Sequence, residues 1–228
     1  MHEHDHDDHD HDHDDHDHGH PHAPRKDHDS GPVSAYEMLE EAVRTLLVEK
    51  GVLTPQEIAA SVDLMDSRTP ALGAKVVARA WVDPAFRRLL LADTRAALLQ
   101  MGVDIGAAPE FATVENSPRV HNVIVCTLCS CYPKMLIGIP PAWYKSLAYR
   151  SRTVTDPRGV LAEFGVEVPG DVEVRVHDST ADLRYLVLPM RPKGTRAWSE
   201  ADLAALVTRD CLIGTAIPVA PKGKRKAA

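Results

Sequence analysis

Residues 123–131 read Val-Ile-Val-Cys-Thr-Leu-Cys-Ser-Cys and contain three of the four cysteines of the chain. The apolar residues at the start predict a buried strand, whose end would deliver Cys126, Cys129 and Cys131 to one point. Because a single serine separates the last two cysteines, the backbone amides of Ser130 and Cys131 must point toward whatever the sulfurs hold. Thiols this close together indicate a metal site. The geometry suits a hard, highly charged ion with planar nitrogen ligands better than tetrahedral zinc.

Other interpretations of the three cysteines compete with this one. Structural zinc would need a fourth ligand from Cys211, His121 or His177, and ligands on either side of one residue strain a tetrahedral site. A redox dithiol would need no third cysteine, and the following segment lacks a thioredoxin-like helix pattern. Three unrelated core cysteines would need no such spacing. A low-spin trivalent metal, bound by three thiolates and two deprotonated amides, would leave a sixth position for substrate or water.

The composition places the chain among globular proteins and narrows its partners. It has 228 residues, with 44% hydrophobic and 26% charged residues. Residues 1–29 hold eleven acids and two bases, a net charge of −9, and the remainder holds 24 bases and 22 acids, a net charge of +2. A near-neutral remainder argues against nucleic-acid binding. With no membrane-length apolar stretch, no signal-peptide core and no disulfide framework, we expect a cytoplasmic protein without a membrane partner.

The two ends of the chain differ in composition from the middle. In residues 1–32, His and Asp alternate with almost no apolar residues, so this segment is predicted to be disordered. Eleven of the 13 histidines lie there beside carboxylates. This segment could bind divalent metal loosely, or it could serve only to keep the protein in solution. Residues 219–228 are expected to form a basic C-terminal tail.

Between these ends the periodicity predicts an α+β fold. Capping signals and helical spacing predict a helical N-terminal region over residues 33–110. Strands and helices are intermixed over residues 111–218, which are expected to form the metal-binding catalytic domain. The expected helices span residues 36–50, 85–101, 156–164 and 199–208 and begin also at residues 54, 69 and 140, and the expected strands span residues 111–115, 120–125, 172–176, 184–188 and 211–217.

The segment Val125–Cys131 resembles the metal-binding claw of the nitrile hydratase α subunit and of the related thiocyanate hydrolase γ subunit. The similarity covers about residues 35–218. Further blocks that carry it are residues 80–84, 89–93, 138–146, 149–152, 156–161, 184–189 and 208–214. The resemblance implies the nitrile hydratase α-subunit fold, with a helical N-terminal region followed by a mixed strand and helix domain that carries the claw.

The resemblance also implies which atoms bind the metal. These are the sulfurs of Cys126, Cys129 and Cys131 and the amide nitrogens of Ser130 and Cys131. In the family the middle cysteine is oxidised to a sulfinic acid and the last to a sulfenic acid, which here are Cys129 and Cys131. The two products stand on different rungs of the thiol oxidation ladder.

The activity and partners implied by the resemblance are specific. Thr127 and Tyr132 indicate Co(III) rather than iron. The metal would polarise a nitrile carbon for attack by water or by the Cys131 sulfenate oxygen, giving the amide. A nitrile hydratase β subunit, in one chain or split into two, is the expected partner. A cobalt-loading activator is a further expected partner.

Two departures from the family pattern lie near the claw. Lys134-Met135 replaces a Trp-Pro pair whose aromatic ring helps to line the nitrile pocket, and residues 107–110 replace Gln-Gly-Glu. Both changes favour a larger or polar nitrile, such as a heteroaromatic one, over a small aliphatic nitrile. Neutral drift at the rim is the equal alternative. Four residues of the matching blocks are expected to shape the subunit interface: Tyr144, Lys145, Arg150 and Arg152.

The leading prediction is therefore the α subunit of a cobalt nitrile hydratase. Thiocyanate hydrolysis is the alternative within the family, because it uses the same claw. A cobalt-binding or cobalt-delivery protein is the alternative from another class, and the His/Asp-rich segment is the feature that favours it.

Overall fold

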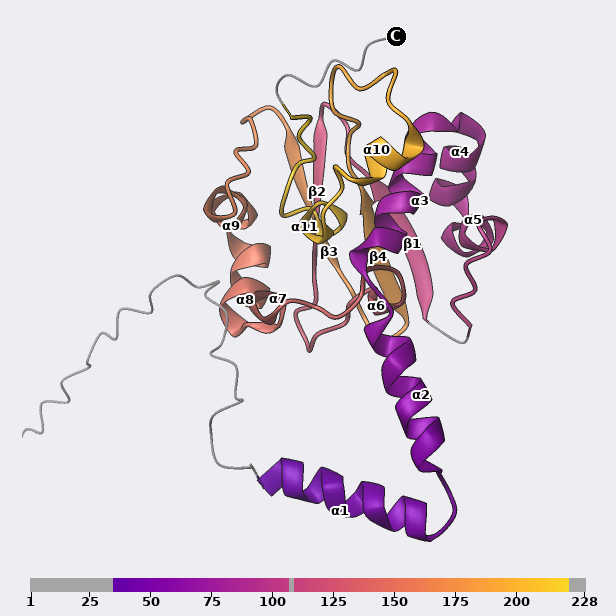
Figure 1. The fold of residues 1–228 in the computed structure, drawn as a ribbon. Helices are drawn as coiled ribbons and strands as arrows, with labels where there is room; N and C mark the ends of the chain where they lie inside the picture. The colour runs from indigo at the N-terminus through magenta and orange to yellow at the C-terminus, as the bar shows by residue number, and fades with distance from the viewer. Residues whose placement is uncertain (1–34, 107–108, 222–228) are drawn as a thin grey trace, which may run out of the picture.

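The computed structural model describes residues 35–106 and 109–221, whose arrangement is shown in Figure 1. The predictions for residues 1–32 and for the basic residues from 222 onward lie outside the described residues. The first half is helical, as expected. Its helices are α1 (Ala35–Glu49), α2 (Pro55–Asp66), α3 (Pro70–Val82), α4 (Pro84–Ala92) and α5 (Thr94–Gln100).

The second half mixes four strands with short helices, and the α+β prediction is confirmed. The strands are β1 (Glu110–Glu115), β2 (Val120–Val125), β3 (Glu173–Asp178) and β4 (Leu183–Leu188). The helices are α6 (Lys134–Ile137), α7 (Ala142–Lys145), α8 (Leu147–Thr155), α9 (Pro157–Glu163), α10 (Glu200–Ala204) and α11 (Arg209–Ile213).

The single helix expected over residues 85–101 is wrong, because the chain breaks it at Asp93. The Asp93 side chain accepts a hydrogen bond from the Ala96 amide at 2.9 Å and so caps α5. The Thr94 hydroxyl lies 3.0 Å from the Leu90 carbonyl and 2.9 Å from the Thr113 hydroxyl on β1. The break therefore lets α5 turn and attach to the strands.

The strand expected over residues 211–217 is also wrong, since this segment begins with α11. Thr208 caps that helix by accepting a hydrogen bond from the Cys211 amide, and Gly214 ends it with a left-handed φ of 94°. The helix expected over residues 199–208 is shorter and ends at Ala204. The short helix α6, just after the cysteines, is an element that the periodicity did not predict.

The strands form two parallel pairs, β1 with β4 and β2 with β3. Because β2 and β3 run in the same direction, their carboxyl ends lie at the same edge. The register pairs Val125, the last residue of β2, with Asp178, the last residue of β3. The cysteine loop follows Val125 directly, so Asp178 stands beside the loop from its first residue.

One hydrophobic core joins the helices α3–α5 to the strands. It includes the fully buried Val76 and Val77 of α3, Ile124 of β2 and Leu186 of β4. Residues from both halves of the sequence pack against β2 in this core. The packing positions the end of β2, where the cysteines follow.

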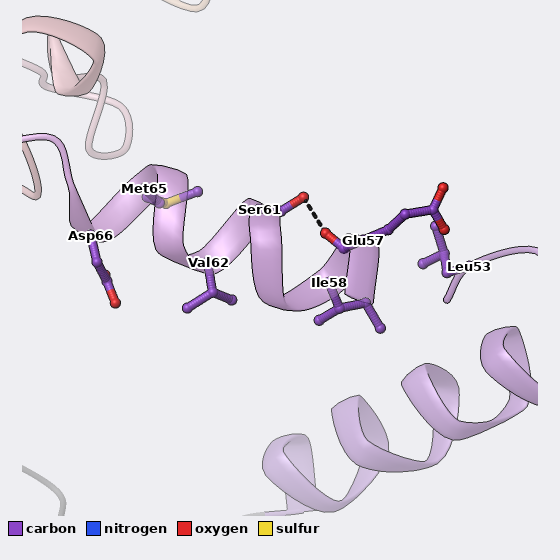
Figure 2. A pocket seen from close by; sticks show the side chains of 7 residues that line it. All are labelled: Leu53, Glu57, Ile58, Ser61, Val62, Met65 and Asp66. Atoms are coloured by element: carbon purple, nitrogen blue, oxygen red, sulfur yellow. Dashed lines mark hydrogen bonds between the residues drawn. The ribbon is translucent and has the colours of Figure 1, made fainter. Parts of the chain in front are cut away.

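Helices α1 and α2 contribute no buried residue and extend away from this body (Figure 1). Figure 2 shows an apolar recess on α2, lined by Ile58, Val62 and Met65 with Leu53 from the preceding turn. None of the described helices has the length and apolar character needed to cross a bilayer.

Candidate metal centre

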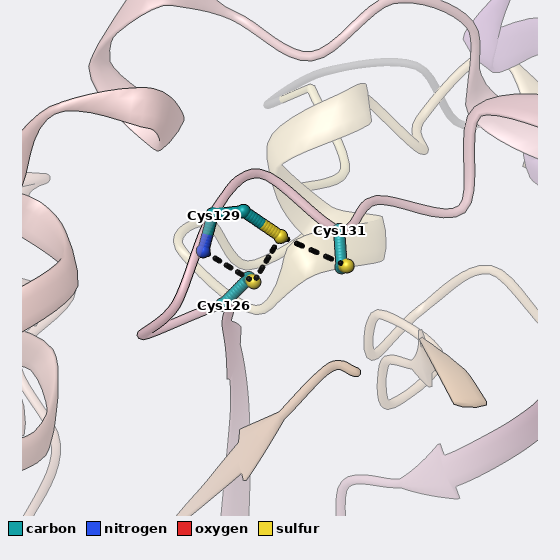
Figure 3. Close-up of side chains that lie close together, drawn as sticks. All are labelled: Cys126, Cys129 and Cys131. Carbon is teal, nitrogen blue, oxygen red and sulfur yellow. Dashed lines mark hydrogen bonds between the residues drawn. The ribbon is translucent and has the colours of Figure 1, made fainter. Parts of the chain in front are cut away.

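The sulfurs of Cys126, Cys129 and Cys131 converge at the end of β2 (Figure 3). The Cys129 sulfur lies 3.5 Å from the Cys126 sulfur and 3.2 Å from the Cys131 sulfur. All three lie within 4.8 Å of one another. The loop is folded tightly enough that the Cys129 amide donates to the Cys126 sulfur at 3.3 Å. All three sulfurs can therefore bind the same metal ion.

The three thiols differ in their exposure to solvent. Cys126 is fully buried at the strand end and Cys131 is also buried, whereas Cys129 and Ser130 are exposed. One side of the cluster is therefore sealed by the protein and the other is open. A ligand would reach the sulfurs from the side of Cys129.

The pKa values of the two outer thiols shift in opposite directions. Hydrogen bonds from the Cys131 and Cys126 thiols, together with the backbone amides of Ser130 and Cys131, lower the pKa of Cys129 to about 7. Burial, followed by the interaction with Cys129, raises the pKa of Cys131, and the positive charge of Arg184 opposes this rise. Both amides therefore favour the thiolate form of Cys129. Their role as metal ligands stays a prediction.

Asp178 holds the start of the cysteine loop through both carboxylate oxygens. It accepts hydrogen bonds from the Thr127 amide at 3.0 Å and from the Thr127 hydroxyl at 2.5 Å. A charged acceptor makes such bonds strong. The β2–β3 register places this carboxylate, so the sheet positions the loop through one side chain.

Three side chains hold the carbonyl groups of the strand end and the loop. Arg150 of α8 donates to the Cys126 carbonyl at 3.1 Å and to the Thr127 carbonyl at 2.8 Å. The buried Tyr144 hydroxyl donates to the Cys131 carbonyl at 2.8 Å, and the Tyr149 hydroxyl donates to the Ile124 carbonyl at 2.6 Å. Burial raises the pKa of both phenols, so both stay protonated and remain donors.

The donor set fits a trivalent metal held by thiolates, and within the described residues it lacks the fourth ligand of a zinc site. Among the described residues, no histidine or carboxylate joins the three sulfurs in the cluster. His121 instead donates to the Gly214 carbonyl at 2.7 Å, and His177 contacts the Asn122 side chain at 2.8 Å. Cys211 is buried at 3.2 Å from the Thr208 hydroxyl. The three residues considered for zinc are therefore occupied elsewhere.

A cavity of about 420 Å³ opens beside the exposed side of the cluster. Cys129, Ser130 and Cys131 form part of its wall, and Tyr132 borders it. A volume of this size is typical of small-molecule sites. The remaining wall residues are Met65, Lys134, Ile139, Pro140, Lys145 and Arg184.

Several residues at this centre were missed from the sequence or were given another role. Asp178 and Arg184 lie far from the cysteines in sequence, and neither belongs to a motif with known metal chemistry. Arg150, expected at a subunit interface, holds the loop within the chain. Arg152, expected there as well, pairs with Glu163 of the same chain.

A family model described as nitrile hydratase, alpha chain, matches residues 34–216. The chain is 51% identical over 182 residues to a low-molecular weight cobalt-containing nitrile hydratase subunit alpha from Rhodococcus rhodochrous, covering 79% of this chain and 88% of the relative. It is 45% identical over 197 residues to thiocyanate hydrolase subunit gamma from Thiobacillus thioparus, covering 82% of this chain and 81% of the relative.

The fold is similar to that of a solved structure of the same kind. This is an Fe-type nitrile hydratase from Comamonas testosteroni Ni1, a double mutant, with a TM-score of 0.76 and 44% sequence identity. The match covers 85% of this chain and 95% of that one. The sequence relatives named for cobalt and the structural relative named for iron together support a metal-binding claw.

Removal of the Asp178 carboxylate should weaken metal binding. In Asp178→Ala the Thr127 amide and hydroxyl lose their acceptor, and we expect cobalt affinity to fall about 10–100-fold, the usual cost of losing a residue that orients metal ligands. Asp178→Asn keeps one acceptor oxygen, so its cobalt affinity should lie between those of the unaltered protein and Asp178→Ala. Competition with a chelator measures the affinity. Asp171→Ala, an exposed acid that does not contact the loop, is the control, and equal affinities of the two alanine variants would contradict the assignment.

In metal-free protein Cys129 should be the first cysteine to be alkylated. Its pKa is lowered to about 7 from an ordinary 9.0, so the reactive thiolate is formed at and above neutral pH and is lost as the pH falls through about 7. Cys126 and Cys131 are buried. Iodoacetamide treatment from pH 6 to 9, followed by peptide mass analysis, reports each site. Equal labelling of the three thiols would show that the exposure and pKa differences do not exist in solution.

Proposed function

The chain belongs to the nitrile hydratase α-chain family, and from this premise we propose that it is the metal-bearing subunit of a cobalt enzyme that hydrates a nitrile to an amide. The observation that carries the proposal is the convergence of the Cys126, Cys129 and Cys131 sulfurs beside an open cavity. A buried cluster without access would suit a structural metal. A cluster with one open side suits a metal that meets a substrate.

The ion is proposed to be Co(III), held by the three sulfurs and by the deprotonated amides of Ser130 and Cys131. When bound, it would supply Lewis-acid activation of the nitrile. Three observations favour cobalt over iron: Thr127, Tyr132 and the cobalt-containing relatives.

The residues around the loop give it a fixed shape. Arg150 and Tyr144 donate hydrogen bonds to the carbonyls of Cys126, Thr127 and Cys131, so these carbonyls are held in fixed directions. The Asp178 carboxylate fixes the Thr127 amide. With the loop held by these bonds, its sulfurs and its amides at positions 130 and 131 are proposed to face the ion. Such fixed dipoles need no reorganisation when the substrate binds.

We also propose that Cys129 is oxidised to a sulfinic acid and Cys131 to a sulfenic acid, with an external oxidant such as dioxygen accepting the electrons and supplying the oxygen atoms. Susceptibility to oxidation follows thiolate character and exposure. Cys129 is exposed, whereas Cys131 is buried. These environments support a higher oxidation state for Cys129.

Hydrolysis of thiocyanate is the second candidate function. It is supported by the 45% identity to thiocyanate hydrolase subunit gamma and by the cation Lys134 in the cavity wall. Both reactions add water to a C≡N carbon. This carbon is bonded to another carbon in a nitrile and to sulfur in thiocyanate.

A partner subunit, the β subunit in one or two chains, is proposed to cover α1 and α2. Isolated helices of this length are marginal in water unless they pack on something. Both helices lack buried residues among those that the structure describes. Their exposed apolar side chains are Tyr36, Met38, Leu39, Val43, Leu46, Val62, Leu64 and Met65.

The activity is tested with the chain expressed together with its partner and loaded with cobalt. We expect one cobalt per chain, amide formation from at least one nitrile, and a mass gain of two oxygens on Cys129 and one on Cys131. Cys131→Ala should abolish the activity, because it removes a proposed ligand. Elemental analysis, amide detection and peptide mass analysis provide the three measurements.

Three outcomes separate the alternatives. Release of products from thiocyanate but from no nitrile would select the second function. Cobalt transfer to another apoprotein without any turnover would select a delivery protein. Unmodified thiols with stoichiometric zinc would refute the proposal.

Charged residues on the apolar face of α1 should block assembly. Leu39→Asp combined with Val43→Asp should weaken partner binding at least about 100-fold, since burying an unpaired carboxylate costs about 3 kcal/mol or more. Glu41→Gln is the control, because two positions along a helix place it on the opposite side from Leu39. Sedimentation of the mixed subunits measures assembly. Unchanged assembly of the double variant would place the partner elsewhere.

A further inference from the structure

The cavity beside the cysteines is lined by cations. Lys134, Lys145 and Arg184 form part of its wall, and no aspartate or glutamate lies among the described residues that line it. The three come from separate elements: Lys134 begins α6, Lys145 ends α7 and Arg184 lies on β4. Three elements therefore bring positive charge to one small volume.

These cations have no counter-charge within the described part of the chain. None of the ion pairs there includes Lys134, Lys145 or Arg184. The Arg184 guanidinium donates only a long bond, 3.5 Å, to the neighbouring Leu183 carbonyl. Other arginines at the centre are used differently, since Arg150 donates to two loop carbonyls. A recess with unpaired charge of one sign attracts ions of the opposite sign.

A cation in this wall can offset the charge of the sulfurs, and the half-buried Arg184 is placed for that role. The two lysines are placed differently. Both are exposed residues of the cavity wall, so a ligand that enters from solvent can contact them. Lysine carries its charge on a flexible stem and suits an anion that arrives from solvent.

We propose that this site prefers a substrate whose C≡N group is carried by a small anion, and that Lys134 and Lys145 bind its negative charge. The inference rests on the proposed function and specifies its substrate class. The shared chemistry is a C≡N carbon next to a negative charge, as in a cyano-carboxylate or in thiocyanate. The cavity of about 420 Å³ has room for either.

The test uses the cobalt-loaded complex and two nitriles of nearly equal shape. Cyanoacetate is an anion and cyanoacetamide is its neutral counterpart, and thiocyanate against acetonitrile forms the second pair. We expect a higher kcat/KM for the anion of the preferred pair, with a preference that declines as salt is added. In Lys134→Gln the KM for the anion should rise on the order of tenfold at unchanged kcat, because a hydrogen bond to a charged group is lost. The KM for the neutral nitrile should not change.

Lys145→Gln should act in the same way as Lys134→Gln. Lys75→Gln, which removes an exposed lysine of α3 outside the cavity, should change nothing. Calorimetric titration of cyanoacetate and of thiocyanate into the metal-free complex gives a reading that needs no turnover. Binding should weaken in both cavity variants and stay as in the unaltered complex for Lys75→Gln.

The outcomes distinguish this inference from the proposed function. Hydration of cyanoacetamide at least as efficient as that of cyanoacetate, with no preference for thiocyanate, would overturn the inference and leave the function intact. An equal loss of kcat/KM for charged and neutral nitriles in Lys134→Gln would also overturn it, because Lys134 would then act on the sulfurs and not on the substrate's charge. Absence of all turnover refutes the function, and the titrations then decide alone whether the anion site exists.

Discussion

The parallel pairing of β2 with β3 is the constraint on which the cysteine loop depends. It sets Asp178 beside Val125, and the Asp178 carboxylate then binds the Thr127 amide and hydroxyl. A slip of one residue in this register would turn Asp178 to the other face of the pair and leave the loop without its acceptor. The core that buries Ile124 and Val125 on β2 and Val76 on α3 prevents such a slip. Packing far from the sulfurs thus determines their position.

The loop is held by its carbonyls, and this leaves its chemistry free. Arg150 and Tyr144 donate hydrogen bonds to carbonyl oxygens of the loop. Without these donors, the same oxygens would accept hydrogen bonds from water in the site. Cys129, Ser130 and Cys131 of the loop line the cavity. The same asymmetry makes the thiols unequal before any metal arrives, because Cys129 is exposed and Cys131 is buried. Two cysteines separated by one residue therefore enter different environments.

The claw was predictable from sequence because its ligands are contiguous: spacing alone brings Cys126, Cys129 and Cys131 together. The strands were predictable from local patterns, β2 from its apolar run and β3 and β4 from their alternation. Asp178 was not, since its role arises from a strand register that no local pattern specifies. The segment from Cys211 has the apolar character of a strand, but Thr208 and Gly214 cap it as a helix, and cap geometry prevailed over composition. At Asp93 a cap in the same way divided one apparent helix into two.

Met65 connects the two incomplete surfaces of the chain. It lines the apolar recess on α2 and also the cationic cavity beside the cysteines, and its side chain is exposed. A partner that covers the apolar side of α2 would therefore reach the cavity at the same time. It would exclude water from the wall that the chain leaves open, and a lower dielectric would strengthen the attraction between Lys134 and an anion. Assembly and substrate selection would then be linked by geometry, because Met65 belongs both to the surface proposed for the partner and to the cavity proposed for the substrate.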